Sequence, residues 1–189
     1  MRVLSAILLL TLLSACGEGS SAGGRLQLAG GLLRPGQAGG IDIVTGLDLQ
    51  LSDAANEALQ QGLELTLAAE ARIGRRHPGW AWQVYHRRFE WQIAYLPLSR
   101  HYRLVAPDGR TVTYARWRHL VTALAEPQTL PLDWRPESGE RATYQVQLRV
   151  WLDRQKLPSP LRLPALFSRD WRHASGWHTW LWPAAGSTR

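Results

Sequence analysis

The stretch that decides the fold is Leu63-Glu64-Leu65-Thr66-Leu67-Ala68-Ala69-Glu70-Ala71-Arg72-Ile73. Apolar side chains occupy every odd position, and polar or charged side chains occupy most of the even ones. This alternation predicts a long β-strand with one buried face, because successive side chains of a strand point to opposite sides of the sheet. Residues 141–152 repeat the pattern, with apolar residues at Tyr144, Val146, Leu148, Val150 and Leu152. Two such strands predict antiparallel sheets that each place one face on a common core.

Shorter strands are predicted around these two. They fall at residues 41–51, 80–95 (as one or two strands), 100–106, 111–114, 129–134 and 176–182. Pro131 predicts an edge position for the fifth of them, because proline cannot donate a hydrogen bond to a neighbouring strand.

Two helices and one extended segment complete the predicted architecture. Ser52 is a suitable N-cap for a helix over 53–61, and residues 116–126 carry apolar side chains at helical spacing. The proline-rich residues 157–164 are predicted to be extended. The fold class is therefore predicted as mainly β, an antiparallel β-sandwich with one or two short helices packed against it.

The N-terminus matches a bacterial lipoprotein signal. Residues 3–13 form an apolar run that is too short to span a membrane, and two small residues then precede Cys16, the only cysteine. We predict cleavage before Cys16 and lipidation of its thiol; an ordinary signal peptide with a chance cysteine is the alternative. Gly17, where an aspartate would favour retention at the inner membrane, favours the outer membrane. The protein is thus predicted to be exported and lipid-anchored, facing the periplasm.

The chain divides into four predicted parts. Residues 1–15 are the signal peptide, 16–40 the lipidated cysteine and a Gly-rich tether, 41–183 a single β-rich domain, and 184–189 a disordered tail. The tether is predicted from nine glycines between positions 17 and 40, a composition typical of flexible linkers. Four leucines in the same segment leave open a weak strand or a membrane contact: Leu26, Leu28, Leu32 and Leu33.

The composition is basic and rich in tryptophan. The formal net charge is +7, and Lys156 is the only lysine. Export argues against nucleic acid as the partner, and an arginine bias of the genome is the plain explanation for the charge. Anionic lipid or lipopolysaccharide is the better acidic partner, because guanidinium forks match phosphate groups. The ten tryptophans either fill a core or form a binding face.

No pattern of residues predicts catalysis, a metal or a cofactor. Phosphate loops, serine elbows and paired-histidine zinc motifs are absent from the sequence. Ser168, Asp170 and His173 invite a hydrolase triad, but a triad is defined by geometry, and Ser168 as the cap of a turn is the favoured interpretation. His173 and His178 as a metal pair are likewise less favoured than surface histidines.

One mixture of basic and aromatic residues predicts a possible binding face. Guanidinium and indole groups stack favourably, so an exposed set would contact a glycan, a lipid or a protein. The candidates are Arg87, Arg88, Trp91, Arg100, Arg103, Arg169, Trp171 and Arg172. Burial of the tryptophans in the core is the alternative.

Three stretches resemble a known family. They are 51–62, which starts Leu-Ser-Asp-Ala, 98–104 (Leu-Ser-Arg-His-Tyr-Arg-Leu) and 157–171, which ends Phe-Ser-Arg-Asp-Trp. The chain is similar over about residues 41–182 to the bacterial exported family known as domain of unknown function 4390. The resemblance implies a small exported protein of Gram-negative bacteria, often encoded near a sensor-kinase pair. The family has no established activity, so no catalytic residues are carried over.

The sequence therefore predicts an envelope lipoprotein that is not an enzyme. The leading interpretation is an interaction or sensing-accessory domain that contacts another envelope protein or a sensor kinase. The alternative is a periplasmic domain that binds lipid or lipopolysaccharide through an Arg/Trp face or the sandwich interior. An unrecognised hydrolase is the third interpretation.

Overall fold

The computed structural model describes residues 23–77, 80–136 and 143–183. Over these residues the protein is mainly β, with two antiparallel sheets and three short α-helices. The mainly-β prediction is confirmed, and the helices number three where one or two were predicted. The segments predicted as signal peptide (1–15) and C-terminal tail (184–189), together with Cys16, lie outside the described residues.

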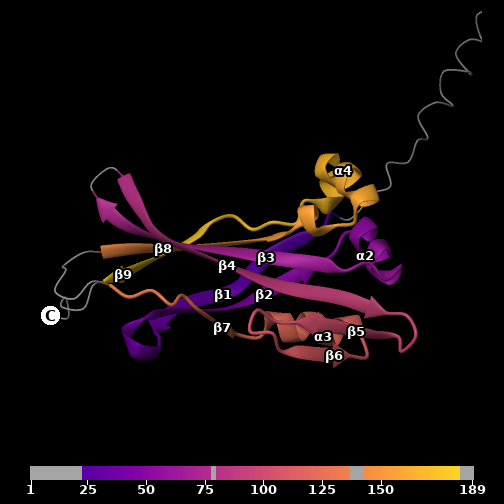
Figure 1. Cartoon of the computed structure of the whole chain (residues 1–189), viewed down its shortest axis with the longest axis horizontal. Coiled ribbons are helices and arrows are strands. Elements are labelled where there is room, and N and C mark those ends of the chain that lie inside the picture. Colours follow the sequence, from indigo (N-terminus) through magenta and orange to yellow (C-terminus); the bar gives the residue numbers. More distant parts are fainter. Residues whose placement is uncertain (1–22, 78–79, 137–142, 184–189) are drawn as a thin grey trace, which may run out of the picture.

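The strands run as follows (Figure 1). The three-stranded sheet has the order β1-β2-β7, with β1 at Arg25–Pro35, β2 at Ile41–Gln50 and β7 at Gln128–Pro131. The six-stranded sheet has the order β6-β5-β4-β3-β8-β9, with β3 at Leu65–His77, β4 at Trp80–Leu96, β5 at His101–Val105, β6 at Thr111–Tyr114, β8 at Thr143–Leu152 and β9 at His178–Pro183. The edge position predicted for the strand at Pro131 is confirmed, because β7 is at one side of its sheet.

The helices connect the strands. They are α2 (Asp53–Gln60), α3 (Trp117–Ala125) and α4 (Ser159–Phe167), with the 3-10 turns η2 (Gln37–Gly39), η3 (Arg154–Lys156) and η4 (Arg169–Trp171). Ser52 caps α2 as predicted, since its hydroxyl accepts the Ala55 N–H at 3.2 Å. Gly62 follows α2 with a positive φ of 86°, which ends the helix at low steric cost.

The two strands with the cleanest alternation pair with each other at the centre of the larger sheet. β3 lies between β4 and β8, and Ala69 is opposite both Phe89 and Val150. The odd-numbered residues of β3 therefore join the even-numbered residues of β8 on one face. That face is buried, and the opposite face carries the charged residues of the same strands.

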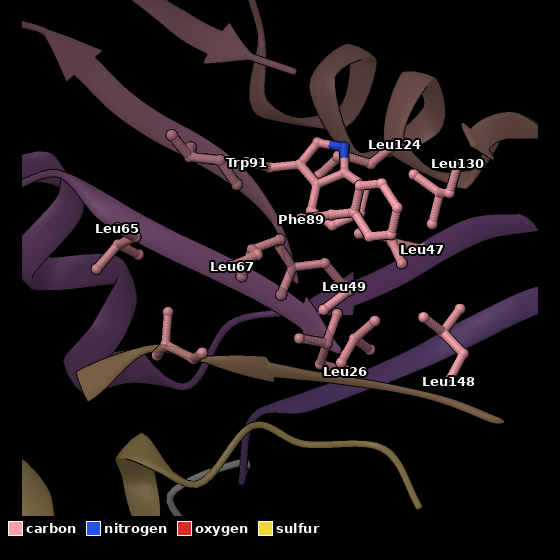
Figure 2. Close-up of a cluster of buried hydrophobic side chains, with 14 of the residues drawn as sticks. Leu26, Leu47, Leu49, Leu65, Leu67, Phe89, Trp91, Leu124, Leu130 and Leu148 are labelled. Carbon is pink, nitrogen blue, oxygen red and sulfur yellow. The ribbon is translucent and has the colours of Figure 1, made fainter. Parts of the chain in front are cut away.

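One hydrophobic core fills the space between the two sheets. Figure 2 shows Trp91 and Phe89 of β4 extending toward Leu124 of α3 and Leu130 of β7, which belongs to the other sheet. Lower in the same view, Leu26 of β1 lies near Leu148 of β8. All of these side chains are at most 5% exposed, so the interior between the sheets is occupied by side chains.

The predicted tether is partly wrong, because its second half is a strand. β1 pairs antiparallel with β2 from Arg25 to Pro35, and Leu26 is fully buried. The glycines that suggested a linker have another use here. The register shifts between Ala29 and Leu32, where Gly30 adopts a φ of +75°, a conformation that favours glycine. Glycine in this segment accommodates a β-bulge, and the domain starts at or before Arg25.

The extended segment predicted for residues 157–164 is also wrong. Residues Ser159–Phe167 form α4. Pro160 is tolerated because it lies in the first turn, where a backbone N–H has no partner within the helix. At the other end, Arg154 donates from Nη1 to the carbonyls of Ala165 and Leu166, at 3.1 and 2.9 Å. The prolines predict an extended segment, but the Arg154 guanidinium provides donors for the free carbonyls at the end of the helix.

Within the described ranges, no helix has the length and apolar character that crossing a membrane requires.

Candidate functional site

The outer face of the six-stranded sheet carries an alternating set of guanidinium and indole groups. We call it the arginine–tryptophan ladder; it consists of Arg72, Arg88, Arg149, Trp151 and Trp177. The strand register creates it, because Arg88 of β4, Glu70 of β3 and Arg149 of β8 are directly opposite one another. Their side chains point away from the core, since their neighbours in sequence face inward.

The ladder is continuous from one end to the other. The Arg72 and Arg149 guanidinium carbons lie 4.5 and 4.7 Å from the centre of the Trp177 ring. The Arg149 guanidinium carbon also lies 4.9 Å from the centre of the Trp151 ring. The Arg88 guanidinium carbon lies 5.3 Å from the centre of the same Trp151 ring. Each of these distances is within the range of a cation–π interaction.

A bulge in the chain next to β8 places Trp177 at the ladder. Trp151 is opposite Ala174, but Leu148 is opposite His178. Three residues (Ser175, Gly176 and Trp177) therefore oppose two (Arg149 and Val150). The additional residue shifts the alternation, and the Trp177 ring contacts two guanidinium groups while remaining 37% exposed.

Carboxylates fix the guanidinium groups in place. Glu70 accepts hydrogen bonds from Arg72 and Arg149, both at 2.8 Å. Burial alone would raise the pKa of Glu70, but these two arginines outweigh it and hold the pKa below its ordinary value of 4.5. Arg88 is held by Glu90 at 2.9 Å and by the buried Asp153. The arginine side chains stay 37–44% exposed, so the ladder is ordered and still accessible.

A cleft of about 340 Å³ adjoins the ladder. Its lining includes two ladder residues, Arg149 and Trp151, and two further arginines, Arg154 and Arg172. No carboxylate is among the described residues that line it. Three guanidinium groups around one cleft favour an anionic ligand, because each presents several N–H donors to a phosphate or carboxylate.

His173 forms the floor of this cleft and joins four segments of the chain. It is 1% exposed, and its Nε2 accepts the N–H of Ser52 at 3.0 Å. Its carbonyl accepts the N–H of Leu152 at 2.8 Å. A Cβ at Gly24 would lie only 1.6 Å from Nε2, so the start of β1 passes directly over the ring. Burial lowers the pKa of His173 below 6.5, while the Trp171 backbone and the Asp170 carboxylate oppose this effect.

We expect the protein to lose stability as the pH falls below about 6.5, through His173. Above that pH the ring is neutral in both the folded and the unfolded chain. Below it the unfolded chain binds the proton first, because burial holds the folded pKa lower, and the loss continues until the pH reaches the folded pKa. Urea unfolding between about pH 7 and pH 5 measures this. His173→Gln keeps an acceptor for the Ser52 N–H and does not titrate, so its stability should change less. Equal pH dependence in both proteins would contradict the assignment.

The structure separates the eight residues of the predicted binding face. Trp91 and Trp171 are buried, at 1% and 7% exposure, in agreement with the core alternative. Arg87 lies on the core side of β4 and pairs with Asp133. Arg103 lies on β5 and pairs with Glu64. Arg100 lies in the turn before β5. Only Arg88 belongs to the ladder, and Trp171 and Arg172 line the adjoining cleft. Arg169 lies in η4 and is exposed.

The residues considered for a hydrolase triad have other partners. Ser168 caps η4, since its hydroxyl accepts the Asp170 N–H at 3.1 Å, and the same hydroxyl lies 3.2 Å from the Asp170 carboxylate. The Nε2 of His173 is occupied by the Ser52 N–H. The Ser52 hydroxyl donates to the Asp170 carbonyl at 2.6 Å and so holds η4 against the start of α2. These contacts do not join a nucleophile to a base.

Two further clefts lie near β7, away from the ladder. These neighbouring clefts, of about 550 and 650 Å³, share Asp108, Thr129 and Pro131. Arg87 lines the first, beside Phe89, and is paired with Asp133. Both arginines and aspartates line these two clefts, so neither cleft favours an anionic ligand as clearly as the cleft next to the ladder.

A family model matches residues 33–181, which is most of the chain. Its description is Domain of unknown function (DUF4390). The chain belongs to the DUF4390 family. The resemblance seen in the sequence is thereby confirmed, and the match begins inside β1, in the segment predicted as tether. No curated protein and no solved structure matches the chain.

Sequence reasoning missed most of the ladder of this DUF4390 protein. Glu70, Arg72 and Arg149 were recognised as the polar side of two strands, but not as neighbours in space. One signal was present: Trp151 occupies a position at which the alternation of residues 141–152 predicts a polar residue. A large aromatic residue on the solvent side of a strand indicates a contact surface or a cation–π partner. The position of Trp177 depends on a bulge that no local pattern revealed.

Proposed function

We propose that this DUF4390 protein is an exported, lipid-anchored component of the bacterial cell envelope. In this proposal its β-sandwich domain is a non-enzymatic interaction module that contacts an envelope protein or a sensor kinase. The lipoprotein signal ending at Cys16 supports the anchor and the periplasmic location. The family resemblance supports the envelope setting.

The arginine–tryptophan ladder is the single observation that carries the proposal. Tryptophan and arginine are enriched among the residues that dominate binding energy at protein interfaces. Here the side chains are already ordered by Glu70, Glu90 and Asp153 before a partner arrives. A partner therefore binds with a smaller loss of side-chain entropy than a mobile arginine surface would impose. The entropy of ordering these arginine side chains is already lost in the free protein.

We expect photo-crosslinking in intact cells to capture a discrete envelope protein from the ladder side. A photoreactive residue at Thr179, exposed on β9 and paired with Gln147 beside the ladder, should give this adduct. The same residue at Thr113, which is also exposed and lies on β6 at the far edge of the sheet, should not. Trp177→Ala, which removes the ring that two arginines contact, should reduce the Thr179 adduct at least about fivefold.

Two outcomes would contradict the interaction module. One is equal crosslinking from Thr179 and Thr113, and the other is an adduct that persists unchanged in Trp177→Ala. Neither outcome depends on overall folding, because Trp177 is partly exposed and its loss leaves the core intact.

A second function is favoured by the cleft of three arginines. We propose as the alternative that the domain binds an anionic lipid or lipopolysaccharide, with Arg149, Arg154 and Arg172 around the phosphate. The described interior between the sheets is filled by side chains, so this alternative uses the surface cleft. The same crosslinking experiment separates the two functions. An adduct that carries lipid or glycan mass, lost in Arg172→Gln, would support this alternative over a protein partner.

The anchor itself makes a separate prediction. The mature protein from a Gram-negative host should start at Cys16 and carry added acyl mass, and it should partition with the membrane. Cys16→Ala should lose both the mass and the partition. Intact-mass measurement and membrane fractionation test this. A wild-type protein that is cut elsewhere, soluble and without lipid would overturn the anchor and leave a diffusible periplasmic protein.

A further inference from the structure

Helix α4 presents an apolar face to solvent. Leu163 is 66% exposed, Leu166 36% and Phe167 82%. Their spacing of three and four residues places them on one side of the helix. The opposite side is seated on the domain, since Ala165 is fully buried. An exposed phenylalanine next to two exposed leucines is unfavourable in water, and it indicates a surface that is covered in the working protein.

This face is held outward by specific contacts. Arg154 donates to the carbonyls of Ala165 and Leu166, and Arg162 donates to the carbonyl of Leu157 at 3.1 Å. Leu157 is 1% exposed and fixes the start of the segment. The helix is therefore attached at both ends, and its apolar residues remain exposed although the chain around them is ordered.

The apolar face lies at the end of the domain where the chain enters. Gly24 touches His173, which follows η4, and η4 packs against both α2 and α4. Figure 1 shows α4 and α2 together at one end of the long axis, with β1 starting beneath α4. Cys16 is seven residues before Gly23, so the chain between them spans at most about 25 Å. A lipid on Cys16 would keep this end of the domain close to the bilayer.

The charges around α4 suit an anionic surface. Residues 154–172 contain five basic side chains (Arg154, Lys156, Arg162, Arg169 and Arg172) and one acidic side chain, Asp170. The neighbouring helix α2 adds Asp53 and Glu57, so these two segments together carry a net charge of +2. Basic residues that flank an apolar helical face are typical of helices that lie in a membrane interface.

We propose that α4 is a membrane-docking surface, with Leu163, Leu166 and Phe167 inserted at the headgroup–acyl boundary of an anionic bilayer. Arg162 and Arg169 lie beside the insertion and contact lipid phosphates. The proposal rests on the lipid anchor proposed above, which supplies the proximity. Docking at α4 orients the domain, so that its long axis extends from the membrane toward the periplasm.

The test uses the full chain as produced by a Gram-negative host, reconstituted in vesicles of phosphatidylethanolamine and phosphatidylglycerol. A photoreactive residue replaces Phe167, and in a matched variant it replaces Leu98, a fully exposed leucine in the turn between β4 and β5. We expect phospholipid adducts from position 167 at a yield at least about tenfold above position 98. Vesicles of phosphatidylcholine alone, or Arg162→Gln with Arg169→Gln, should lower the yield from position 167.

The lipid adducts test the docking surface. The intact mass of the protein in the same samples tests the lipid anchor on Cys16 separately. Equal lipid adducts from positions 167 and 98 would overturn docking, as would a protein adduct from position 167 in intact cells in place of lipid. Acyl mass on Cys16 without lipid adducts at 167 means that the anchor stands and the docking surface fails. Lipid adducts at position 167 on a chain without acyl mass mean that the docking surface stands and the anchor fails. Leu163→Ser and Phe167→Ser should leave thermal unfolding unchanged, because both residues are exposed.

Discussion

Trp91→Ala is expected to lower the free energy of unfolding by about 3–5 kcal/mol, the range for removing a large aromatic side chain from a core. Trp91 is 1% exposed and lies where β4 meets α3 and β7, so its ring connects the two sheets. Its Nε1 donates to Gln128 Oε1 at 3.0 Å, and Gln128 in turn donates to the Leu124 carbonyl at 3.2 Å. Removal of the indole leaves a cavity and also leaves the Gln128 amide oxygen without its donor.

Thermal and urea unfolding measure this effect, and Trp177→Ala is the matched control. Both variants remove an indole, but Trp177 is 37% exposed and its ring contacts the Arg72 and Arg149 guanidinium groups on the outer face of the sheet. We expect a loss of about 1 kcal/mol for Trp177→Ala. Similar losses in the two variants would show that the division of the tryptophans between core and ladder is wrong. Trp91→Phe should fall between Trp91→Ala and the parent.

Gly46→Ala is expected to destabilise the protein by about 3 kcal/mol, although it adds a single methyl group. A Cβ at Gly46 would lie 2.0 Å from the carbonyl oxygen of Ala125 and 2.6 Å from its carbonyl carbon. Both atoms belong to the backbone at the end of α3, so no side-chain rotation can relieve the contact. The helix must move away from β2, and Leu124 then packs less well in the core.

Gly176→Ala provides the control for this prediction. A Cβ at Gly176 would meet no atom within 4 Å, so the stability should stay within about 0.5 kcal/mol of the parent. Chemical denaturation of both variants with a common slope gives the comparison. A Gly46→Ala protein as stable as Gly176→Ala would mean that α3 does not rest on β2 as described.

Much of the fold follows from local patterns. The alternation in residues 63–73 and 141–152 gave β3 and β8, and the cap at Ser52 gave α2. These predictions succeeded because burial of one face imposes a period of two on a strand, and a helix start needs an acceptor for its free N–H groups. The helix at residues 116–126 was also confirmed, as α3, from its apolar spacing.

The failures share a physical cause. The glycines of residues 16–40 predict a tether where β1 forms, because glycine is typical of both linkers and bulges, and only pairing with β2 distinguishes them. The sequence does not predict α4, because the carbonyls at its end accept hydrogen bonds from Arg154, which lies in the preceding turn η3. The structure separates the residues of the predicted binding face for the same reason, since a list of arginines and tryptophans contains no information on which strands become neighbours.

By itself the sequence determined the family, the mainly-β class and the faces of the two central strands, because these depend on side chains close together along the chain. Only the tertiary structure decided which tryptophans are core and which belong to the ladder, since Trp91 and Trp151 both lie in alternating strands. It also brought Arg88, Glu70 and Arg149 into one row, through the register of three strands. Register is set by packing across the whole sheet, which no local segment contains.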